Sequence, residues 1–301
     1  MPEKLRGAVA ALGNFDGFHM GHQAVAGAAI EKAREEGRPA IIATFDPHPV
    51  RHFAPHIPPF RLTTLEQRRE IFEGAGADAM LVFDFGDALA STSAENFIRD
   101  LLAQRLGIRT VVTGEDFTFG KARGGNASVL RDIGAKYGLD NIAIPPVEDA
   151  GGIVSSSRVR DALKAGEVKV ANALLTRPFA VRGTVQHGDK NGRKLGFPTA
   201  NIDMGHYLRP RYGIYAVKGR LPGGRILDGA ANLGIRPSFD PPKELLEPHF
   251  FDFDEELYGA EIEVEFHGFI RPEAKFDDLD ALKKQITLDC VEAKGLLAEK
   301  R

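Results

Sequence analysis

The chain has 301 residues, of which 43% are hydrophobic and 27% charged, with a formal net charge of −3 and a single cysteine, Cys290. This length suits about two domains, the charge gives no electrostatic argument for a nucleic-acid partner, and one cysteine excludes both an intrachain disulfide and a cysteine-cluster metal site. Because no apolar run is long enough for a signal-peptide core or a membrane span, we expect a cytoplasmic protein with no membrane partner.

The first predicted strand, Ala8–Leu12, runs into a tight turn and then into an alanine-rich helix. The turn and the helix start contain Gly13, Asn14, Phe15, Asp16, His19, Gly21 and His22. Backbone N–H groups and the positive end of the helix dipole meet at such a point, which favours an anion, and two imidazoles add donors for a polyphosphate. The pattern resembles the HxGH signature of nucleotidylyltransferases. A His-x-x-His pair is also a common capping or packing pair, and it could form half of a metal site.

Strands and helices alternate through the rest of the N-terminal half. Capping boxes at Thr64-x-x-Gln67 and Thr92-x-x-Glu95 predict helix starts. The alternation predicts a Rossmann-like parallel sheet covered on both faces, with ligands beyond the carboxyl ends of the strands. The later predicted strands are Ala40–Phe45, Ala79–Phe83, Thr110–Thr113 and Asn141–Ile144.

Three further polar clusters each follow a predicted strand. They comprise Asp46, Pro47 and His48 after the second strand, Asp116 and Phe117 after the fourth, and Ser155, Ser156, Ser157, Arg158 and Arg160 after the fifth. Arginine suits phosphate because its planar fork gives bidentate, charge-assisted hydrogen bonds. Taken alone, the serine run is a good helix N-cap and the phenylalanines are core or pocket wall. The shared position after strands favours one nucleotide site.

The reaction at such a site depends on its nucleophile. If a phosphate ester attacks the α-phosphorus of ATP, the nucleophile is already ionised at neutral pH and needs no general base. The protein then only aligns the substrates and stabilises charge on the phosphate oxygens. His19 and His22 are therefore expected to donate hydrogen bonds to phosphate.

After Pro178 the pattern changes from alternating strands and helices to strands and turns. Glu261–His267 alternates strictly, so Ile262, Val264 and Phe266 should face a core. We predict an antiparallel β-barrel or sandwich closed by a helix from about Asp278 that buries Leu279, Leu282 and Ile286. The other predicted strands are Phe179–Val185, Tyr212–Val217, Ile226–Asn232 and Phe250–Phe253. The predicted domains are residues 1–176, of the Rossmann-like nucleotidylyltransferase class, and residues 177–301.

A glycine-rich segment in this second half is a candidate ATP loop. Gly188, Lys190, Gly192, Gly196 and Pro198 precede Thr199 and Asn201. Glycines let backbone N–H groups approach phosphates, and two oxygen ligands two residues apart suit Mg²⁺. The alternative is a hairpin loop whose glycines only permit turning.

Glu247, directly before Pro248, is the candidate general base of the second half. An alcohol that attacks phosphorus must lose a proton, unlike an ionised phosphate. The alternative is an edge-strand carboxylate in water.

These motifs, in this order over essentially the whole chain, resemble the bifunctional riboflavin kinase/FMN adenylyltransferase (prokaryotic FAD synthetase) family. The matching segments are GNFDGFHMGH, TFDPHP, RLTTLEQR, GEDFTFG, SSSRVR, GRKLGFPTAN, YGIYAV and DFDEELYG. The resemblance implies two reactions: riboflavin and ATP give FMN and ADP, and FMN and ATP then give FAD and pyrophosphate. It assigns adenylylation to the N-terminal domain and phosphorylation to the barrel, with ATP, riboflavin, FMN and FAD as its small-molecule partners.

The resemblance also implies roles for individual residues. Gly13, Asn14, Phe15, Asp16, His19, His22, Ser155–Ser157, Arg158 and Arg160 bind ATP for adenylylation, and Asp116 lies near the flavin or the nucleotide. We expect Asp46, Pro47, His48, Asp116 and Phe117 to bind the flavin of this reaction. Gly188 to Gly196 wraps the kinase ATP, Thr199 and Asn201 hold Mg²⁺, and Glu247 is the base. The sequence departs from the family at Pro248, at the proline-rich segment before Glu247, at Asp46 (commonly Glu) and at Ser157 (commonly Thr). Pro248 weakens the assignment of the base.

Two other functions compete with this interpretation. One is a flavin- or nucleotide-binding carrier or regulator that has lost one activity, against which the complete HxGH, SSSRVR and PTAN motifs argue. The other is a single-activity adenylyltransferase whose barrel only binds FMN, which Pro248 favours. The patterning leaves the oligomeric state open.

Overall fold

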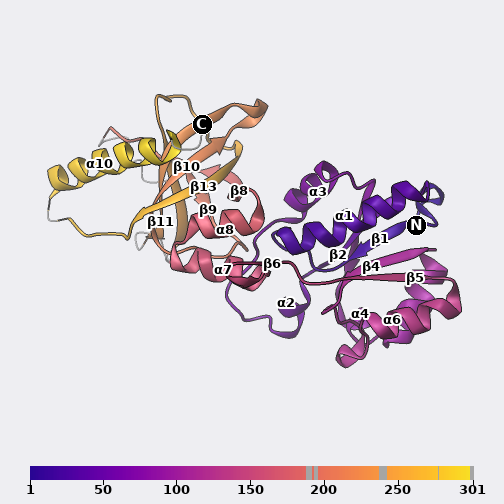
Figure 1. The fold of residues 1–301 in the computed structure, drawn as a ribbon. Helices are drawn as coiled ribbons and strands as arrows, with labels where there is room; N and C mark the ends of the chain where they lie inside the picture. Colours follow the sequence, from indigo (N-terminus) through magenta and orange to yellow (C-terminus); the bar gives the residue numbers. More distant parts are fainter. Residues whose placement is uncertain (188–191, 193–195, 237–242, 277, 299–301) are drawn as a thin grey trace. The chain divides into compact units, whose positions relative to one another are not determined.

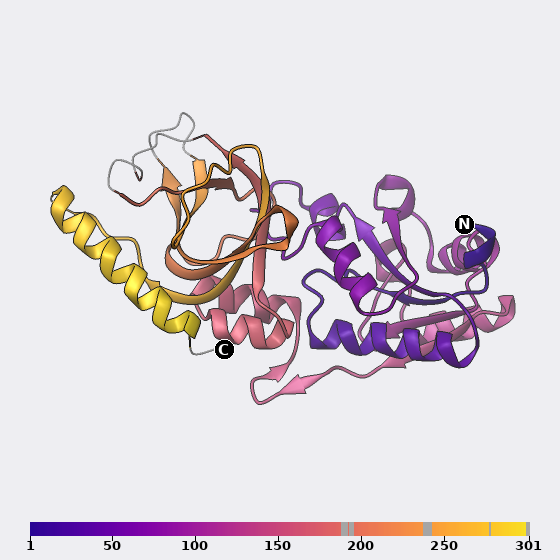
Figure 2. The same cartoon turned by 90° about the horizontal axis from the view of Figure 1, so that it is seen from above.

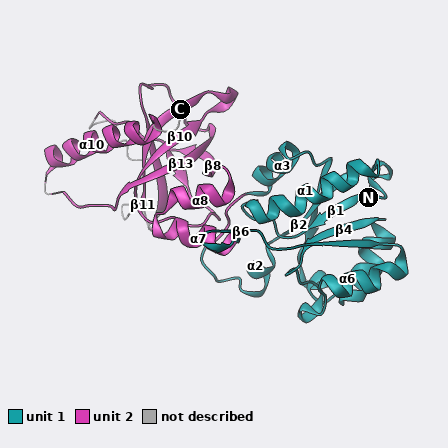
Figure 3. Ribbon diagram, in the orientation of Figure 1, with its two compact units in different colours: residues 1–58, 64–155 teal, residues 59–63, 156–301 magenta. Residues whose placement is uncertain are grey.

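The chain forms two compact units (Figure 1). The computed structural model describes residues 1–187, 192, 196–236, 243–276 and 278–298. The first unit comprises residues 1–58 and 64–155, and the second comprises residues 59–63 and 156–301 (Figure 3). Helices α7 (Ser156–Ala165) and α8 (Val168–Leu175) therefore lie in the second unit. The division of function at residue 176 stays a prediction.

The first unit is built on a five-stranded parallel sheet, as the alternating pattern predicts. Its strand order, β3-β2-β1-β4-β5, places β1 at the centre. Each predicted strand is present within one residue of its expected bounds: β1 (Val9–Leu12), β2 (Ala40–Asp46), β3 (Ala79–Asp84), β4 (Thr110–Gly114) and β5 (Asp140–Ile144). Parallel neighbours end at the same edge of a sheet, so the loops after β1, β2 and β4 share one edge.

Helices cover both faces of this sheet. Ala10 and Leu12 of β1 pack with η2 (Phe97–Arg105) and α6 (Ala127–Gly134), whereas Val9 and Ala11 pack with α1 (Met20–Glu35) and α3 (Leu65–Gly74). Because both faces are buried, every residue of β1 is apolar. The shorter elements are η1 (Glu3–Leu5), α2 (Pro49–Phe53), α4 (Asp87–Ala90), α5 (Ala94–Asn96), η3 (Lys121–Arg123), η4 (Ala135–Tyr137), β6 (Glu148–Asp149) and β7 (Gly152–Ile153).

One of the two predicted capping boxes is confirmed. The Thr64 hydroxyl accepts a hydrogen bond from Gln67 N at 3.1 Å, and Gln67 Oε1 accepts one from Thr64 N at 3.0 Å. The box at Thr92 is wrong, because Ser93 is the N-cap and accepts from Asn96 N at 3.2 Å. The Thr92 hydroxyl instead donates to Ala88 O at 2.8 Å, since α4 ends just before it and leaves that carbonyl within reach.

The second unit contains a closed antiparallel barrel with the strand order β10-β11-β12-β9-β8-β13 (Figure 2). Ile262, Val264 and Phe266 are at most 1% exposed, so the strict alternation identified the core face correctly. Closure gives each of these six strands a partner on both sides. The strands are β8 (Phe179–Gln186), β9 (Asn201–Asp203), β10 (Gly213–Arg220), β11 (Ile226–Arg236), β12 (Lys243–Phe250) and β13 (Glu261–Arg271), with η5 (Pro222–Gly224) after β10.

The closing helix, α10 (Leu279–Ala298), packs on β10, β11 and β13. Asp278 caps it by accepting a hydrogen bond from Ala281 N at 2.7 Å. The expected burial of Leu279 is wrong: this side chain is 67% exposed, and Leu282 and Ile286 are half-buried. The C-terminal half of α10 packs into the core through Ala293 and Leu297. The first turns of the helix lie beside a pocket. No helix in the described part of the chain has the length and hydrophobicity to cross a membrane.

Candidate active sites

The turn after β1 places two histidines at the N-terminus of α1. His19 is the N-cap residue and is 5% exposed, and the rings of His19 and His22 stack with their centroids 3.7 Å apart. Gly21 permits this stacking, because a Cβ atom there would lie 3.2 Å from the His19 ring. Both imidazoles therefore stand beside the first-turn N–H groups of α1, where the helix dipole favours an anion.

Buried phenylalanines fix the shape of this turn. Phe15 and Phe18 have φ angles of 49° and 47°, a left-handed conformation that is costly for bulky side chains. Both rings pack against Phe72 of α3, with centroids 5.9 Å and 5.1 Å away. At the start of the turn, Gly13 N donates to Ala43 O of β2 at 3.1 Å. Apolar burial and a bond to the neighbouring strand thus hold the turn before any ligand binds.

The candidate flavin residues lie in loops at the same edge of the sheet. Asp46 ends β2 next to the turn after β1, and its side chain is 36% exposed. His48 is buried, and its Nδ1 atom accepts a hydrogen bond from Val50 N at 3.2 Å, which caps α2. Pro47, between them, is exposed. Asp46 and Pro47 therefore face outward, whereas His48 supports the loop.

The loop after β4 reaches the same edge. Asp116 is exposed and folds back over Gly114, where a Cβ atom would lie 2.8 Å from its Oδ1 atom. Phe117 is half-buried and stacks on Phe119 with ring centroids 5.8 Å apart. The structure thus brings three of the predicted clusters to one edge of the first unit.

The fourth cluster crosses the boundary between the units. Ser155 ends the first unit, directly after Val154, whose carbonyl oxygen packs against Gly21 of the histidine turn. The residues from Ser156 onward form the first turns of α7 in the second unit. There, Arg160 Nε donates to Phe60 O at 2.9 Å and its guanidinium lies 5.2 Å from the centre of the Phe60 ring. Ser156 and Arg158 are half-buried, and Ser157 is exposed.

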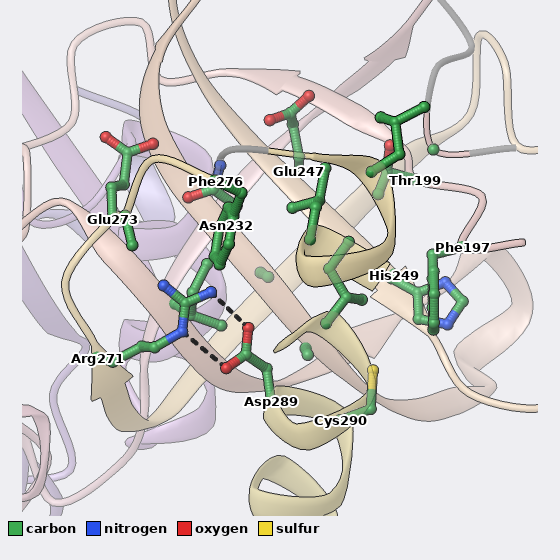
Figure 4. A pocket seen from close by; sticks show the side chains of 18 of the residues that line it. Phe197, Thr199, Asn232, Glu247, His249, Arg271, Glu273, Phe276, Asp289 and Cys290 are labelled. Carbon is green, nitrogen blue, oxygen red and sulfur yellow. Dashed lines mark hydrogen bonds and ion pairs between the residues drawn. The ribbon is translucent and has the colours of Figure 1, made fainter. Parts of the chain in front are cut away.

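A pocket of about 610 Å³ opens between the barrel and α10 (Figure 4). Its volume lies in the range of small-molecule sites. Glu247 and Thr199 lie toward one end of the pocket, and Asp289 and Cys290 of α10 toward the other (Figure 4). The apolar lining consists of Phe197, Ile214, Ala230, Ala231, Ala274, Phe276, Leu279, Leu282 and Ile286.

Glu247 lies within strand β12, which ends at Phe250, so the predicted strand Phe250–Phe253 is wrong. Glu247 pairs in register with Asn232 of β11, and both residues line the pocket. Asn232 Oδ1 is buried and makes no hydrogen bond within the described residues. Because β12 pairs with β11 and β9 in a closed barrel, Glu247 is not on an edge strand. The pocket therefore combines a carboxylate with an amide oxygen that can accept a hydrogen bond from a ligand.

Pro248 does not disturb this strand. It stays in register with Ala231, beyond the two residues of β12 that pair with β9. Its carbonyl accepts a hydrogen bond from Ala200 N at 3.0 Å, and the adjacent His249 Nδ1 lies 2.9 Å from Pro198 O. These two contacts bracket Thr199 and hold it beside β12. The proline that weakened the assignment of Glu247 thus helps to position the candidate metal ligand.

A second pocket, of about 400 Å³, is lined by Pro198 and by Thr199, and Thr199 also lines the first pocket. Its other lining residues include Phe253, Glu256 and Tyr258 from the segment after β12. Asn201 begins β9 and is 9% exposed. Of the predicted ATP loop, Gly192 and Gly196 are described, and Gly192 O accepts a hydrogen bond from Phe197 N at 2.8 Å. Gly188 and Lys190 lie outside the described residues.

An ion pair that the sequence analysis missed connects α10 to the barrel. Arg271 at the end of β13 donates to both carboxylate oxygens of Asp289, at 2.8 Å and 2.7 Å. Asp289 is 3% exposed, and Gln285 donates to it at 3.0 Å. In the sequence, the one sign of this ion pair was that Asp289 is a polar residue within a helical pattern, directly before Cys290. The pair fixes the helix that forms one wall of the pocket.

Comparison with known proteins gives consistent matches along the chain. A family model described as FAD synthetase matches residues 1–158, and one described as riboflavin kinase matches residues 175–297. The bifunctional riboflavin kinase/FMN adenylyltransferases of Escherichia coli K12 and Bacillus subtilis are each 38% identical to this chain. The match to the E. coli protein covers 94% of this chain and 90% of that protein. The match to the B. subtilis protein covers 95% of this chain and 91% of that protein. A crystal structure described as a macrolide-efflux protein from Streptococcus pneumoniae superposes with a TM-score of 0.86 at 31% identity, covering 96% of this chain and 93% of that one.

Proposed function

The chain belongs to the bifunctional riboflavin kinase/FMN adenylyltransferase family, and on that premise we propose how its residues perform the two reactions. The protein phosphorylates riboflavin with ATP and transfers an adenylyl group from ATP to FMN. We assign adenylyl transfer to residues 1–176 and phosphorylation to residues 177–301. The observation that carries this division is that a pocket of small-molecule size presents a carboxylate, Glu247, in the barrel, whereas the first unit presents a stacked histidine pair at a helix N-terminus.

In the kinase reaction, riboflavin occupies the larger pocket with its ribityl chain toward Glu247 and its ring system against α10. The Glu247 carboxylate accepts the proton of the terminal hydroxyl while the hydroxyl oxygen attacks the γ-phosphorus of ATP and ADP leaves. ATP occupies the smaller pocket, and its phosphates extend toward Thr199 and the glycine loop. Thr199 borders both pockets, which supports phosphate transfer at that point.

The donors at this point fit a hard cation. Thr199 and Asn201 offer hydroxyl and amide oxygens, the ligand type that Mg²⁺ prefers, and Mg²⁺ usually completes its shell with water and substrate phosphates. Bound there, the ion would neutralise charge on the ATP phosphates. Pro248 and His249, through their contacts with Ala200 and Pro198, hold Thr199 in place for this role.

In adenylyl transfer, the FMN phosphate is the nucleophile. It attacks the α-phosphorus of ATP, the bond to the bridging oxygen breaks, and pyrophosphate leaves. His19 and His22 donate hydrogen bonds to phosphate oxygens as charge develops, assisted by the turn residues Gly13 to Asp16. Ser155, Ser156, Ser157, Arg158 and Arg160 contribute further donors to ATP, and Asp46, Pro47, His48, Asp116 and Phe117 form or support the flavin side. We place both reactions in the cytoplasm, where ATP is supplied.

The decisive experiment is a time course of the purified full chain with riboflavin, ATP and Mg²⁺, in which riboflavin, FMN and FAD are separated by chromatography. FMN that rises before FAD supports the assignment of both activities. Removal of Mg²⁺ with EDTA should stop FMN formation, and continued formation would contradict the metal role of Thr199 and Asn201. FMN without FAD would contradict the assignment of the histidine turn. FAD only from supplied FMN would contradict the role of Glu247.

A further inference from the structure

Arg68 of α3 is a fully buried arginine at the sheet edge that carries the histidine turn. Its exposure is 0%. Its Nη1 atom donates to Thr44 Oγ1 at 2.8 Å and to Asn14 O at 3.2 Å, and its Nε atom lies 3.5 Å from Thr64 O. The Thr44 hydroxyl also donates to Asn14 O, at 2.8 Å. One guanidinium therefore connects α3, the end of β2 and the turn after β1.

The partners of Arg68 indicate a geometric role. Burying a guanidinium is costly, and a close carboxylate usually offsets that cost. The Asp46 carboxylate lies 3.9 Å from Nη2, and Nη1 donates to a hydroxyl at 2.8 Å and to a main-chain carbonyl at 3.2 Å. Nη1 contacts both groups while Nε of the same rigid plane faces Thr64 O, a fixed arrangement of donors that the flexible ammonium of a lysine does not reproduce.

The two segments that Arg68 joins belong to different substrates. Asn14 lies in the turn that leads to His19 and the ATP phosphates. Thr44 and Asp46 lie at the end of β2, where the candidate flavin loop begins. The turn also contains left-handed residues, Phe15 and Phe18, so its backbone needs such external support.

We propose that Arg68 is a positioning residue of adenylyl transfer, which sets the spacing between the ATP turn and the FMN loop. This inference rests on the proposed function of the first unit. Arg68 acts without contacting the reacting groups: it holds the main chain of the turn at Asn14 and the Thr44 side chain of β2, which precedes the flavin loop. Its effect should therefore appear when both substrates must meet, because a displacement of about 1 Å between reacting groups costs about 10²-fold in rate.

The test compares Arg68→Met and Arg68→Lys with the wild-type full chain. We expect the kcat of FAD formation from FMN and ATP to fall about 10²-fold in both variants, while the separate Kd values for FMN and for a non-hydrolysable ATP analogue change less than about threefold. Riboflavin kinase activity, measured in the same preparations, should be unchanged. Arg69→Met is the matched control, because Arg69 is the exposed neighbour on the same helix and pairs with Glu73.

Thr44→Val is the second variant, since it removes the hydroxyl between Arg68 and Asn14 while keeping the side-chain shape. We expect a loss of about tenfold in kcat, and no further loss when Thr44→Val is combined with Arg68→Met, because both act through one contact. This variant decides the question if Arg68→Met fails to fold.

Three results would overturn the inference. The first is wild-type kcat in Arg68→Met or Arg68→Lys. The second is a rise in the Kd of either ligand as large as the loss in kcat, which indicates ordinary destabilisation. The third is additive losses in the double variant. A wild-type chain that makes no FAD would instead contradict the proposed function itself, before any variant is compared.

Discussion

In the proposed assignment, the first unit and the barrel both promote attack on a phosphorus of ATP, but they present different chemical groups. The first unit presents histidines at a helix N-terminus, in a turn held by buried phenylalanines. The barrel presents a carboxylate from the middle of a strand. The proposed nucleophiles explain the difference: a phosphate is already ionised at neutral pH, whereas an alcohol must lose a proton during attack. The protonation state of the nucleophile therefore decides which unit needs a base.

The two units also differ in how they hold their groups. In the barrel, Glu247 and Asn232 are fixed by the register of two paired strands. In the first unit, the corresponding residues lie at or beyond the strand ends, and a buried side chain, Arg68, connects the turn after β1 to strand β2. Loops allow substrates to approach a sheet edge, but their geometry depends on such additional contacts.

The largest effect is expected at Glu247. Glu247→Gln keeps the size of the side chain but removes its basicity, so FMN formation should slow by about 10²–10⁴-fold. FAD formation from supplied FMN should be unchanged, because the phosphate nucleophile needs no base. Both rates can be measured by chromatography of the flavins. A near-normal kinase rate would remove the contrast between the units.

The next largest effect is expected at His22. His22→Ala removes a donor to the ATP phosphates, so FAD formation should fall by about 10²–10³-fold while FMN formation continues. His56→Ala is the matched control, since His56 is exposed in the same unit. Loss of both activities in His22→Ala would show that the sites are not independent.

A moderate effect is expected from the ion pair that fixes α10. Asp289→Asn weakens the two charge-assisted bonds from Arg271, which should lower the free energy of unfolding by about 2 kcal/mol. The pocket wall should loosen, so the KM for riboflavin should rise about tenfold while kcat changes less. Thermal unfolding and kinase assays measure these effects. Glu292→Gln, on an exposed position of the same helix, should match the wild type, and an unchanged KM in Asp289→Asn would argue against a role in the pocket.

The smallest effect concerns Cys290, which lines the same pocket. Burial, together with the neighbouring Asp289 carboxylate, raises the pKa of the Cys290 thiol. A raised pKa keeps the thiol protonated to higher pH, so alkylation by iodoacetamide should begin to accelerate above the pH range typical of an exposed thiol. Riboflavin should slow the labelling a few-fold further. Mass spectrometry can follow the modification, and a rate equal to that of a small-molecule thiol at each pH would contradict this environment.

Local patterns predicted most of the elements in both units. Continuous apolar runs identified the five parallel strands, and strict alternation identified the buried face of β13. The errors arose where a choice depended on neighbours in space. Thr92 and Ser93 are both acceptable caps in sequence, and the carbonyl of Ala88 decided between them. Leu279 fits the apolar stripe of α10, but the first turn of that helix lies beside a pocket.

The candidate site residues also divide into those that a local motif indicates and those that depend on neighbours in space. Motifs of short range made His19, His22, Thr199 and Glu247 candidates, because each lies in a run of characteristic residues. No sequence pattern pointed to Asn232 or Asp289, and Arg68 was covered only as the last residue of the matching segment RLTTLEQR. Asn232 matters because its strand pairs with that of Glu247, and Asp289 because a helix returns to the end of β13.

The amino-acid sequence by itself determined the family and the two classes of fold and supplied the candidate residues of each site, because these depend on short segments and their periodicity. The tertiary structure decided that Pro248 supports Thr199, that α10 forms a pocket wall, and that Arg68 joins the turn after β1 to strand β2. Each of these depends on contacts between residues distant in the chain. Such contacts form only when the strands pair and the helices pack, so no local pattern records them.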